Sequence, residues 1–435
     1  MKGDPTDKAG QRLTRRQFIK TGTAAAAVAA VSLGGLPKLT GRAHAAKRDY
    51  ILIGRPNPFT GPLSVFGDNS PWTDDRAIAA MNKDGGFYIE ELGKKIPVKI
   101  KIVDTQSDPT KTAEVTARLI TKDKVDFIIA NSSPLTVNPA SAICEKYQVP
   151  CIAMEVPAEP WLTGGPYKWS YLACFDLESL ADLYIEFWDS KAQQTNKVVG
   201  ALWPNDADGI SFTEIFTRKL AAKNYKLIDP GRFPFFSKDF STIINLFKKN
   251  KVEILTGALL PPDWTTVWRQ CHQMGFIPKF ATIGKALLLP GAVEALGGDL
   301  GNGLSTECWW SPYHPFKSSL SGESCMDLAK AWTKDTGKEW TQPLGFKYAG
   351  FEILADVLKR CKTLDKHKFM KAFGETNMTT MMGPIKYNKQ HYAPTPLVGG
   401  QWLKGKKFPW NLEVVYNKSY PSIPTTAKML FPITQ

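Results

Sequence analysis

The chain has 435 residues and a formal net charge of +14. This length is too great for one ordinary hydrophobic core, so two lobes are expected. The positive charge is spread along the chain, without the Lys/Arg runs and interleaved aromatic residues of nucleic-acid-binding proteins, so nucleic acid is not an expected partner. We interpret the charge as solvated surface with a modest preference for anionic partners.

Residues 1–45 have the features of a twin-arginine export signal. Residues 14–20 (TRRQFIK) contain the paired arginines, an alanine-rich apolar run covers residues 24–36, and residues 43–45 (AHA) form a small-x-small cleavage site. The apolar run is shorter than the about 20 residues that a membrane span needs. We therefore expect a mature protein that starts at Ala46 and lies in the periplasm. Its net charge is +8, because the signal holds eight Lys or Arg and two Asp.

The seven cysteines and five histidines show no metal-ligand spacing. Cys144 and Cys151 are the only close pair of cysteines, and both a disulfide bond and two buried free thiols are compatible with their spacing. The glycine-rich residues 297–303 do not follow a clear strand, so we interpret them as a turn and not as a phosphate-binding loop. The sequence predicts no metal, no cofactor and no catalytic site.

From Tyr50 onward, predicted strands and helices alternate. The strands are expected over residues 50–54, 98–103, 126–130 and 149–154, and the helices over residues 72–82 and from residue 109. Asp108 is the expected N-cap of the second helix, with Pro109 in its first position. Strand–helix–strand units with such short connections form right-handed crossovers and a parallel sheet.

The segment Asp126–Pro139 carries the main candidate site of the first lobe. An apolar run without alternation, as in a strand covered on both faces, ends in a polar turn. The hydroxyls of this turn belong to Ser132, Ser133 and Thr136. We expect the next helix to begin near Asn138 or Pro139, because proline suits the first helical turn. A helix start with neighbouring hydroxyls suits a carboxylate. The alternative is that the hydroxyls only cap the helix.

The alternation of strands and helices restarts near residue 197. Strands are expected over residues 197–202, 226–228, 252–260 and 280–283, and helices over residues 212–223, 241–249 and 264–274. After Trp309 the sequence predicts mainly helices, over residues 324–334 and 344–360, so we expect this region to return to the first lobe. The strands over residues 385–387 and 398–402 are expected to return to the second.

The expected first lobe is residues 48–174 plus 309–382, and the expected second lobe is residues 175–308 plus 383–435. Two open parallel sheets that face each other bring their carboxyl-end loops into one cleft, where such sheets bind ligands.

Several short motifs follow one another in a fixed order. They are PFTGP (58–62), NKDGG (82–86), DTQSDP (104–109), KVD (124–126), SS (132–133), VP (149–150) and TGGPY (163–167). This order resembles that of type I periplasmic solute-binding proteins, the leucine/isoleucine/valine-binding proteins of branched-chain amino-acid ABC importers. The resemblance implies an α/β fold of two doubly wound parallel-sheet lobes joined by three crossover strands. It also implies Venus-flytrap closure around a small solute and delivery to an inner-membrane ABC permease by a monomer.

The resemblance also carries over site residues. In amino-acid-binding members the Ser-rich turn grips the ligand carboxylate, which implies that role for the three hydroxyls of the turn. The loop after the fourth strand lacks the Ala-Thr pair of the family. We nevertheless assign Glu155 and Val156 of this loop to the ligand site, and expect Glu155 partly to take over the task of the family acid from the other lobe. Asp208 takes the place of a family tyrosine. The family acid that binds the ligand ammonium falls near Lys285, and a lysine there would repel an ammonium. An aromatic carboxylate, a dicarboxylate or an amide-like solute therefore fits at least as well as an aliphatic amino acid. The alternative for Lys285 is a solvated lysine at a lobe edge.

Aromatic side chains near the predicted cleft loops suit a flat or apolar ligand. We expect two of the following five to contact the solute: Phe66, Trp72, Trp161, Trp309 and Trp310. Phe66 and Trp309 are the two that we assign to the site.

The sequence favours a periplasmic binding protein that captures a small carboxylate-bearing solute, an amino acid, an aromatic acid or a similar compound, for an ABC permease. One alternative is a ligand-sensing partner of a membrane receptor, which uses the same cleft. A periplasmic enzyme is the less favoured alternative, because no nucleophile elbow, metal spacing or phosphate loop supports it.

Overall fold

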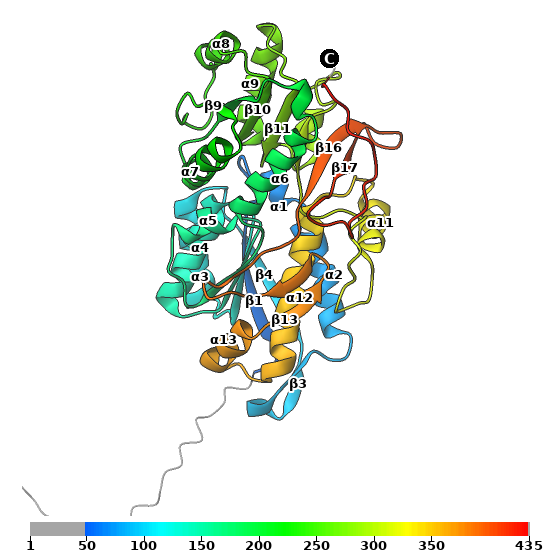
Figure 1. Cartoon of the computed structure of the whole chain (residues 1–435). Coiled ribbons are helices and arrows are strands. Elements are labelled where there is room, and N and C mark those ends of the chain that lie inside the picture. Colours follow the sequence, from blue (N-terminus) through cyan, green and yellow to red (C-terminus); the bar gives the residue numbers. More distant parts are fainter. Residues whose placement is uncertain (1–47, 434–435) are drawn as a thin grey trace, which may run out of the picture. The chain divides into compact units, whose positions relative to one another are not determined.

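The computed structural model describes residues 48–433, so the predicted export signal lies outside the described residues. Strands and helices alternate along this part of the chain and build two large sheets with helices packed on them (Figure 1). None of the helices within residues 48–433 has both the length and the apolar character needed to cross a membrane.

The first sheet is parallel throughout. Its strands in spatial order are β15 (Tyr392–Ala393), β7 (Ser170–Ala173), β6 (Cys151–Met154), β5 (Phe127–Ala130), β1 (Ile51–Asn57) and β4 (Val98–Asp104). Its packed helices are α2 (Ser70–Asn82), α3 (Pro109–Thr121), α4 (Pro134–Tyr147) and α12 (Pro343–Cys361). Every residue of β5, β6 and β7 is buried, which confirms for β5 the prediction of a strand covered on both faces, whereas β7 was not among the predicted strands.

The second sheet combines a parallel part with an antiparallel edge. Its strands in spatial order are β17 (Trp410–Tyr416), β16 (Val398–Lys404), β12 (Ser305–Cys308), β11 (Phe280–Gly284), β10 (Ile254–Ala258), β8 (Val198–Leu202) and β9 (Lys226–Ile228). Strands β16 and β17 run antiparallel to their neighbours. Helices that follow strands of this group are α7 (Ala207–Ala222), α8 (Ser241–Lys249), α9 (Pro261–Gln273) and α10 (Pro290–Glu294), and α6 (Leu177–Asp189) packs on β12 and β16.

Smaller elements complete the described chain. Two two-stranded sheets pair β2 (Phe87–Ile89) with β3 (Lys94–Ile96) and β13 (Asn377–Thr380) with β14 (Gly383–Lys386). The remaining helices are α1 (Ser64–Gly67), α5 (Ala158–Leu162), α11 (Cys325–Thr336), α13 (Lys366–Gly374) and the 3₁₀ turns η1 (Glu90–Leu92) and η2 (Ala192–Gln194).

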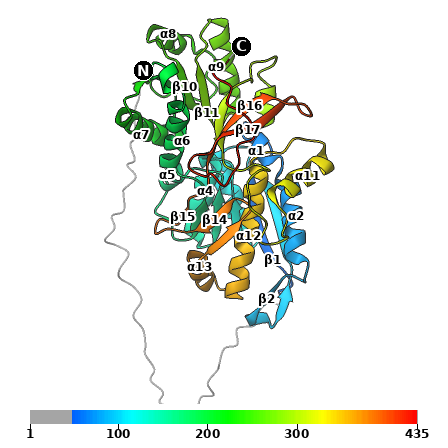
Figure 2. The ribbon, with the colours of Figure 1, turned by 45° about the vertical axis from the view of Figure 1, so that its right-hand side comes forward.

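The described chain passes between the two large sheets three times: after β7, after β12 and between β15 and β16 (Figures 1 and 2). This connectivity confirms the predicted α/β fold of two sheets joined by three crossovers. Ligands of open parallel sheets bind at the carboxyl ends of the strands. The polar residues in the loops at these ends are therefore the candidates for a ligand site.

Some predicted element boundaries are wrong. Helix α4 begins at Pro134 and contains Pro139, because both prolines satisfy the sequence rule and the earlier one takes the first position. Helix α7 begins at Ala207, since Asp206 caps it by accepting a hydrogen bond from the Gly209 N–H at 2.9 Å. The strand predicted over residues 385–387 is β14, which pairs with β13 and not with the second sheet, whereas β16 does join that sheet.

The close cysteine pair is reduced in this structure. Cys144 in the last turn of α4 and Cys151 at the start of β6 are both buried free thiols. Burial raises the pKa of the Cys144 thiol well above its ordinary value, and contact with Cys151 raises it further. The Cys144 thiol therefore stays protonated, and both cysteines pack as small core side chains.

Candidate ligand-binding cleft

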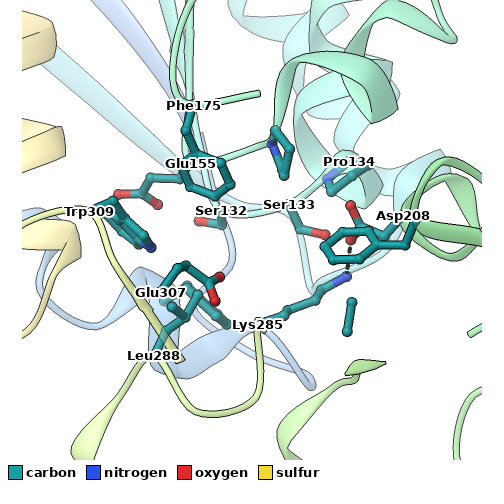
Figure 3. Close-up of a pocket in the computed structure, with 14 residues that line it drawn as sticks. Ser132, Ser133, Pro134, Glu155, Phe175, Asp208, Lys285, Leu288, Glu307 and Trp309 are labelled. Atoms are coloured by element: carbon teal, nitrogen blue, oxygen red, sulfur yellow. Dashed lines mark hydrogen bonds and ion pairs between the residues drawn. The ribbon is translucent and has the colours of Figure 1, made fainter. Parts of the chain in front are cut away.

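One cavity is lined by loops from the carboxyl ends of both large sheets (Figure 3). Its lining residues are Phe66, Ser132, Ser133, Pro134, Glu155, Pro157, Phe175, Asp208, Phe212, Ala258, Lys285, Leu288, Glu307 and Trp309. The cavity volume is about 40 Å³, which holds only a few water molecules at about 10–15 Å³ each. A solute of amino-acid size therefore needs the two sides of this cleft to move apart before it enters.

Three side chains of the cleft leave the backbone at strained positions. Ser132, Glu155 and Lys285 follow β5, β6 and β11, and their φ angles are 101°, 59° and 63°. Positive φ is costly for residues other than glycine and persists where the surroundings enforce it, often at binding sites. These backbone turns aim the three side chains into the cleft at the ends of their strands.

The hydroxyls of the Ser-rich turn divide into two roles. Ser132 Oγ accepts a hydrogen bond from the Asn131 side-chain amide at 2.6 Å, and Ser133 Oγ caps α4 through a weak 3.4 Å bond from the Leu135 N–H. Because both oxygens act as acceptors within the protein, their protons are free to be donated to a ligand. Thr136 is different: it donates to the Asn131 carbonyl at 2.8 Å and does not line the cleft. The capping alternative describes Ser133, which is the N-cap of α4.

Lys285 is not the free counter-charge that the sequence suggested. Its Nζ lies 2.7 Å from Asp208 Oδ2 and 3.6 Å from Asp206 Oδ2. Burial lowers the pKa of Lys285, but the two carboxylates outweigh burial and raise it, so the lysine is charged. Burial raises the pKa of Asp208 to about 6, against the lowering effect of Lys285. The lysine charge is thus already balanced within the second lobe.

Glu307 in β12 is the cleft carboxylate that the sequence interpretation missed. Its Oε2 accepts hydrogen bonds from the Tyr184 hydroxyl at 2.5 Å and from Thr306 at 2.9 Å. Burial raises its pKa, while these hydroxyls lower it. A Cβ on Gly284 would lie 3.4 Å from both carboxylate oxygens, so the glycine at the end of β11 leaves the space that Glu307 fills. The sequence signal that could have revealed Glu307 is an acidic residue inside a short, otherwise uncharged strand, which ends directly before Trp309.

Glu155 is the corresponding acid at the end of β6. Its Oε2 accepts from the Asn131 amide at 3.3 Å. Burial raises the pKa of Glu155, whereas the cations Lys347 and Arg55 lower it. The neighbouring Val156, also predicted to bind the ligand, does not line the cleft, because its apolar side chain is fully buried in the hydrophobic core.

Aromatic rings form the apolar walls. Phe66 and Trp309 line the cleft as predicted, and the sequence interpretation missed Phe175 and Phe212. The Trp309 indole N–H has no protein acceptor within residues 48–433, so it is available to a ligand. The other three predicted rings do not line the cleft and pack in pairs: Trp72 on Trp332, Trp161 on Tyr167 and Trp310 on Trp340.

The cleft offers no resident metal site. Within residues 48–433, no group of three or more His, Cys, Asp or Glu side chains is arranged to hold a metal ion. The cleft presents hydroxyl and indole donors, one balanced lysine, two acids and aromatic walls.

Known proteins share this architecture. A leucine-binding protein from Thermotoga maritima superposes with a TM-score of 0.72 at 21% identity, covering 85% of this chain and 99% of that one. An ABC-transporter solute-binding protein from Rhodopseudomonas palustris, solved with 3,4-dihydroxybenzoic acid, superposes with a TM-score of 0.67 at 18% identity, covering 84% and 97%.

The proteins related to this chain by sequence are binding proteins as well. Leu/Ile/Val-binding protein homolog 1 of Brucella abortus (strain 2308) is 24% identical over 83% of this chain and 92% of its own length. The match to Leu/Ile/Val-binding protein homolog 6 of Brucella suis covers only 57% of that protein, at 22% identity over 54% of this chain. The family model described as "Periplasmic binding protein" matches residues 50–407, which is well over half of the chain. The chain therefore belongs to the periplasmic binding protein family.

Proposed function

We propose that this protein is the solute-binding component of an ABC importer and that its solute is an amino acid with an apolar side chain. One lobe is built on the first sheet, which includes β15 (Tyr392–Ala393), so the boundary predicted at residue 383 moves to the segment between β15 and β16. The other lobe is built on the second sheet, and hinge closure traps the solute between them. The protein acts as a monomer in the periplasm, after export by the twin-arginine route, and delivers the solute to an inner-membrane permease.

The observation that carries the choice of solute is the placement of Glu307. Figure 3 shows its carboxylate and the hydroxyls of Ser132 and Ser133 directed into the same cavity. The Ser hydroxyls suit a carboxylate, and Glu307 suits an ammonium. Since Lys285 is balanced by Asp208, it neither repels an ammonium nor provides a free charge for an anion. A zwitterion satisfies both ends of the cleft.

Relatives leave two solute classes open. The Thermotoga maritima protein is a leucine-binding protein, and the Rhodopseudomonas palustris protein was solved with an aromatic acid. An aromatic acid fits the ring walls of Phe175 and Phe212 but has no cation for Glu307. Burying a carboxylate without a partner is unfavourable, so the charge balance favours the amino acid.

A panel of matched analogues tests this choice by thermal shift. Each set has one molecule with both groups, one without the ammonium and one without the carboxylate: phenylalanine, 3-phenylpropionate and phenethylamine; leucine, 4-methylpentanoate and 3-methylbutylamine. A ligand that binds only the folded protein raises the melting temperature. We expect a shift with an amino acid and none with its two partial analogues.

The other outcomes are informative. A shift with 3-phenylpropionate or dihydroxybenzoate alone contradicts the amino-acid proposal and restores the anionic class. If the gene of this protein lies beside a receptor-kinase gene and not beside permease genes, binding of the solute favours the sensing alternative. Turnover of a bound solute would support the enzyme alternative.

A further inference from the structure

Four charged side chains meet behind the first-lobe wall of the cleft, and we name them the charge quartet: Arg55, Asp74, Glu155 and Lys347. Arg55, Asp74 and Lys347 are fully buried, and Glu155 lies half-buried at the cleft. They come from β1, α2, α12 and the end of β6.

Lys347 ties α12 to the short helix α1, which carries a cleft residue. Its Nζ donates to the main-chain carbonyl of Phe66 and to Asn69 Oδ1, the latter at 2.5 Å. Phe66 lines the cleft from α1, and Asn69 is the N-cap of α2, which follows α1 directly. The lysine therefore fixes the position of the Phe66 ring from behind.

Lys347 also acts on Glu155. Helix α12 packs directly on β6: a Cβ on Gly350, one turn after Lys347, would lie 2.5 Å from Cε of Met154, the residue before Glu155. Burial raises the pKa of Glu155, and Lys347 is the cation that lowers it most, ahead of Arg55. Arg55 in turn lies 3.2 Å from Asp74, which is its nearest counter-charge in the quartet.

We propose that Lys347 is a positioning residue for the cleft, which holds the α1 turn with Phe66, and through the charge quartet the Glu155 side chain, in the ligand-binding arrangement without touching the solute. This role goes beyond solute binding as such but rests on the proposed function for its binding readout. Removing one member of a buried charge set leaves another charge without a partner, so the effect of Lys347 must depend on the residue at position 155.

A double-mutant cycle tests the proposal. The proteins are wild type, Lys347→Met, Glu155→Gln and the double variant, each titrated calorimetrically with leucine and phenylalanine. We expect Lys347→Met to weaken binding about tenfold or more in the wild-type background and by less than about threefold in the Glu155→Gln background. Lys359→Met is the matched control, because Lys359 is exposed in the last turn of the same helix.

A second variant separates the two tasks of the lysine. Lys347→Gln keeps a side-chain donor for the Phe66 carbonyl but has no charge. We expect Lys347→Gln to weaken binding as much as Lys347→Met, because both variants lose the positive charge near Glu155. If Lys347→Met does not fold, Lys347→Gln takes its place in the double-mutant cycle.

Urea unfolding of the same proteins gives a readout without ligand. We expect Lys347→Met to lower the unfolding midpoint more in the wild-type background than in the Glu155→Gln background. Equal losses in both backgrounds, of affinity or of midpoint, overturn the proposal and leave Lys347 a merely structural residue. If wild type binds neither amino acid, the proposed function fails, while the midpoints still decide the role of Lys347.

Discussion

Replacing Glu307 with glutamine is expected to weaken amino-acid binding by about 30- to 100-fold, equal to about 2–3 kcal/mol, the usual value of a charge-assisted hydrogen bond. Glutamine has the shape of glutamate and can still accept a hydrogen bond from Tyr184. What the variant lacks is the negative charge that faces the ligand ammonium. Isothermal titration with the amino acid identified in the panel measures the loss.

The same variant gives an opposite result with the analogue that lacks the ammonium. Because the carboxylate of Glu307 no longer opposes an anion, we expect Glu307→Gln to gain affinity for 3-phenylpropionate or 4-methylpentanoate. Glu214→Gln is the control, since Glu214 is exposed on α7 in the same lobe. Unchanged affinity for the amino acid in Glu307→Gln would remove Glu307 from the site and reopen the anionic solute classes.

The fold was predictable from the sequence because its main signals are local. The buried runs that became β5 and β6, and the Asp108–Pro109 helix start, act within a few residues. Asp108 accepts from the Lys111 N–H at 2.6 Å, as an N-cap does. The sequence does not separate two possible starts of α4, because Pro134 and Pro139 both suit a first helical turn and only packing decides between them.

The charges of the site were less predictable because they depend on pairs far apart in sequence. Lys285 looked like a free cation, and its partner Asp208 is 77 residues away in the first turn of α7. Glu307 escaped notice because β12 is short and polar, with Ser305 and Thr306 before it. The sequence can place such residues near a cleft, but pairing between them is a property of the folded sheets.

Replacing Gly209 with alanine is expected to destabilise the second lobe by about 2–3 kcal/mol, the usual size of an overpacking effect. A Cβ on Gly209 would lie 1.7 Å from the carbonyl oxygen of Pro204 and 2.8 Å from its carbonyl carbon. Both are backbone atoms, so no side chain can rotate away. The first turn of α7 must shift, and that turn carries Asp206 and Asp208, the two partners of Lys285.

A matched variant separates this clash from the ordinary effect of a helical alanine. Gly291 lies in α10, and a Cβ added to it would have nothing within 4 Å, so Gly291→Ala is expected to be neutral or stabilising by up to about 1 kcal/mol. Urea unfolding measures both proteins, and titration with the solute measures the effect on the Lys285 side of the cleft. If Gly209→Ala is as stable as Gly291→Ala, the turn between β8 and α7 has room for a Cβ and the predicted clash with Pro204 is wrong. If it is destabilised but binds normally, the pairing of Lys285 with Asp208 does not position the solute, and recognition then depends on Glu307 and the Ser-rich turn.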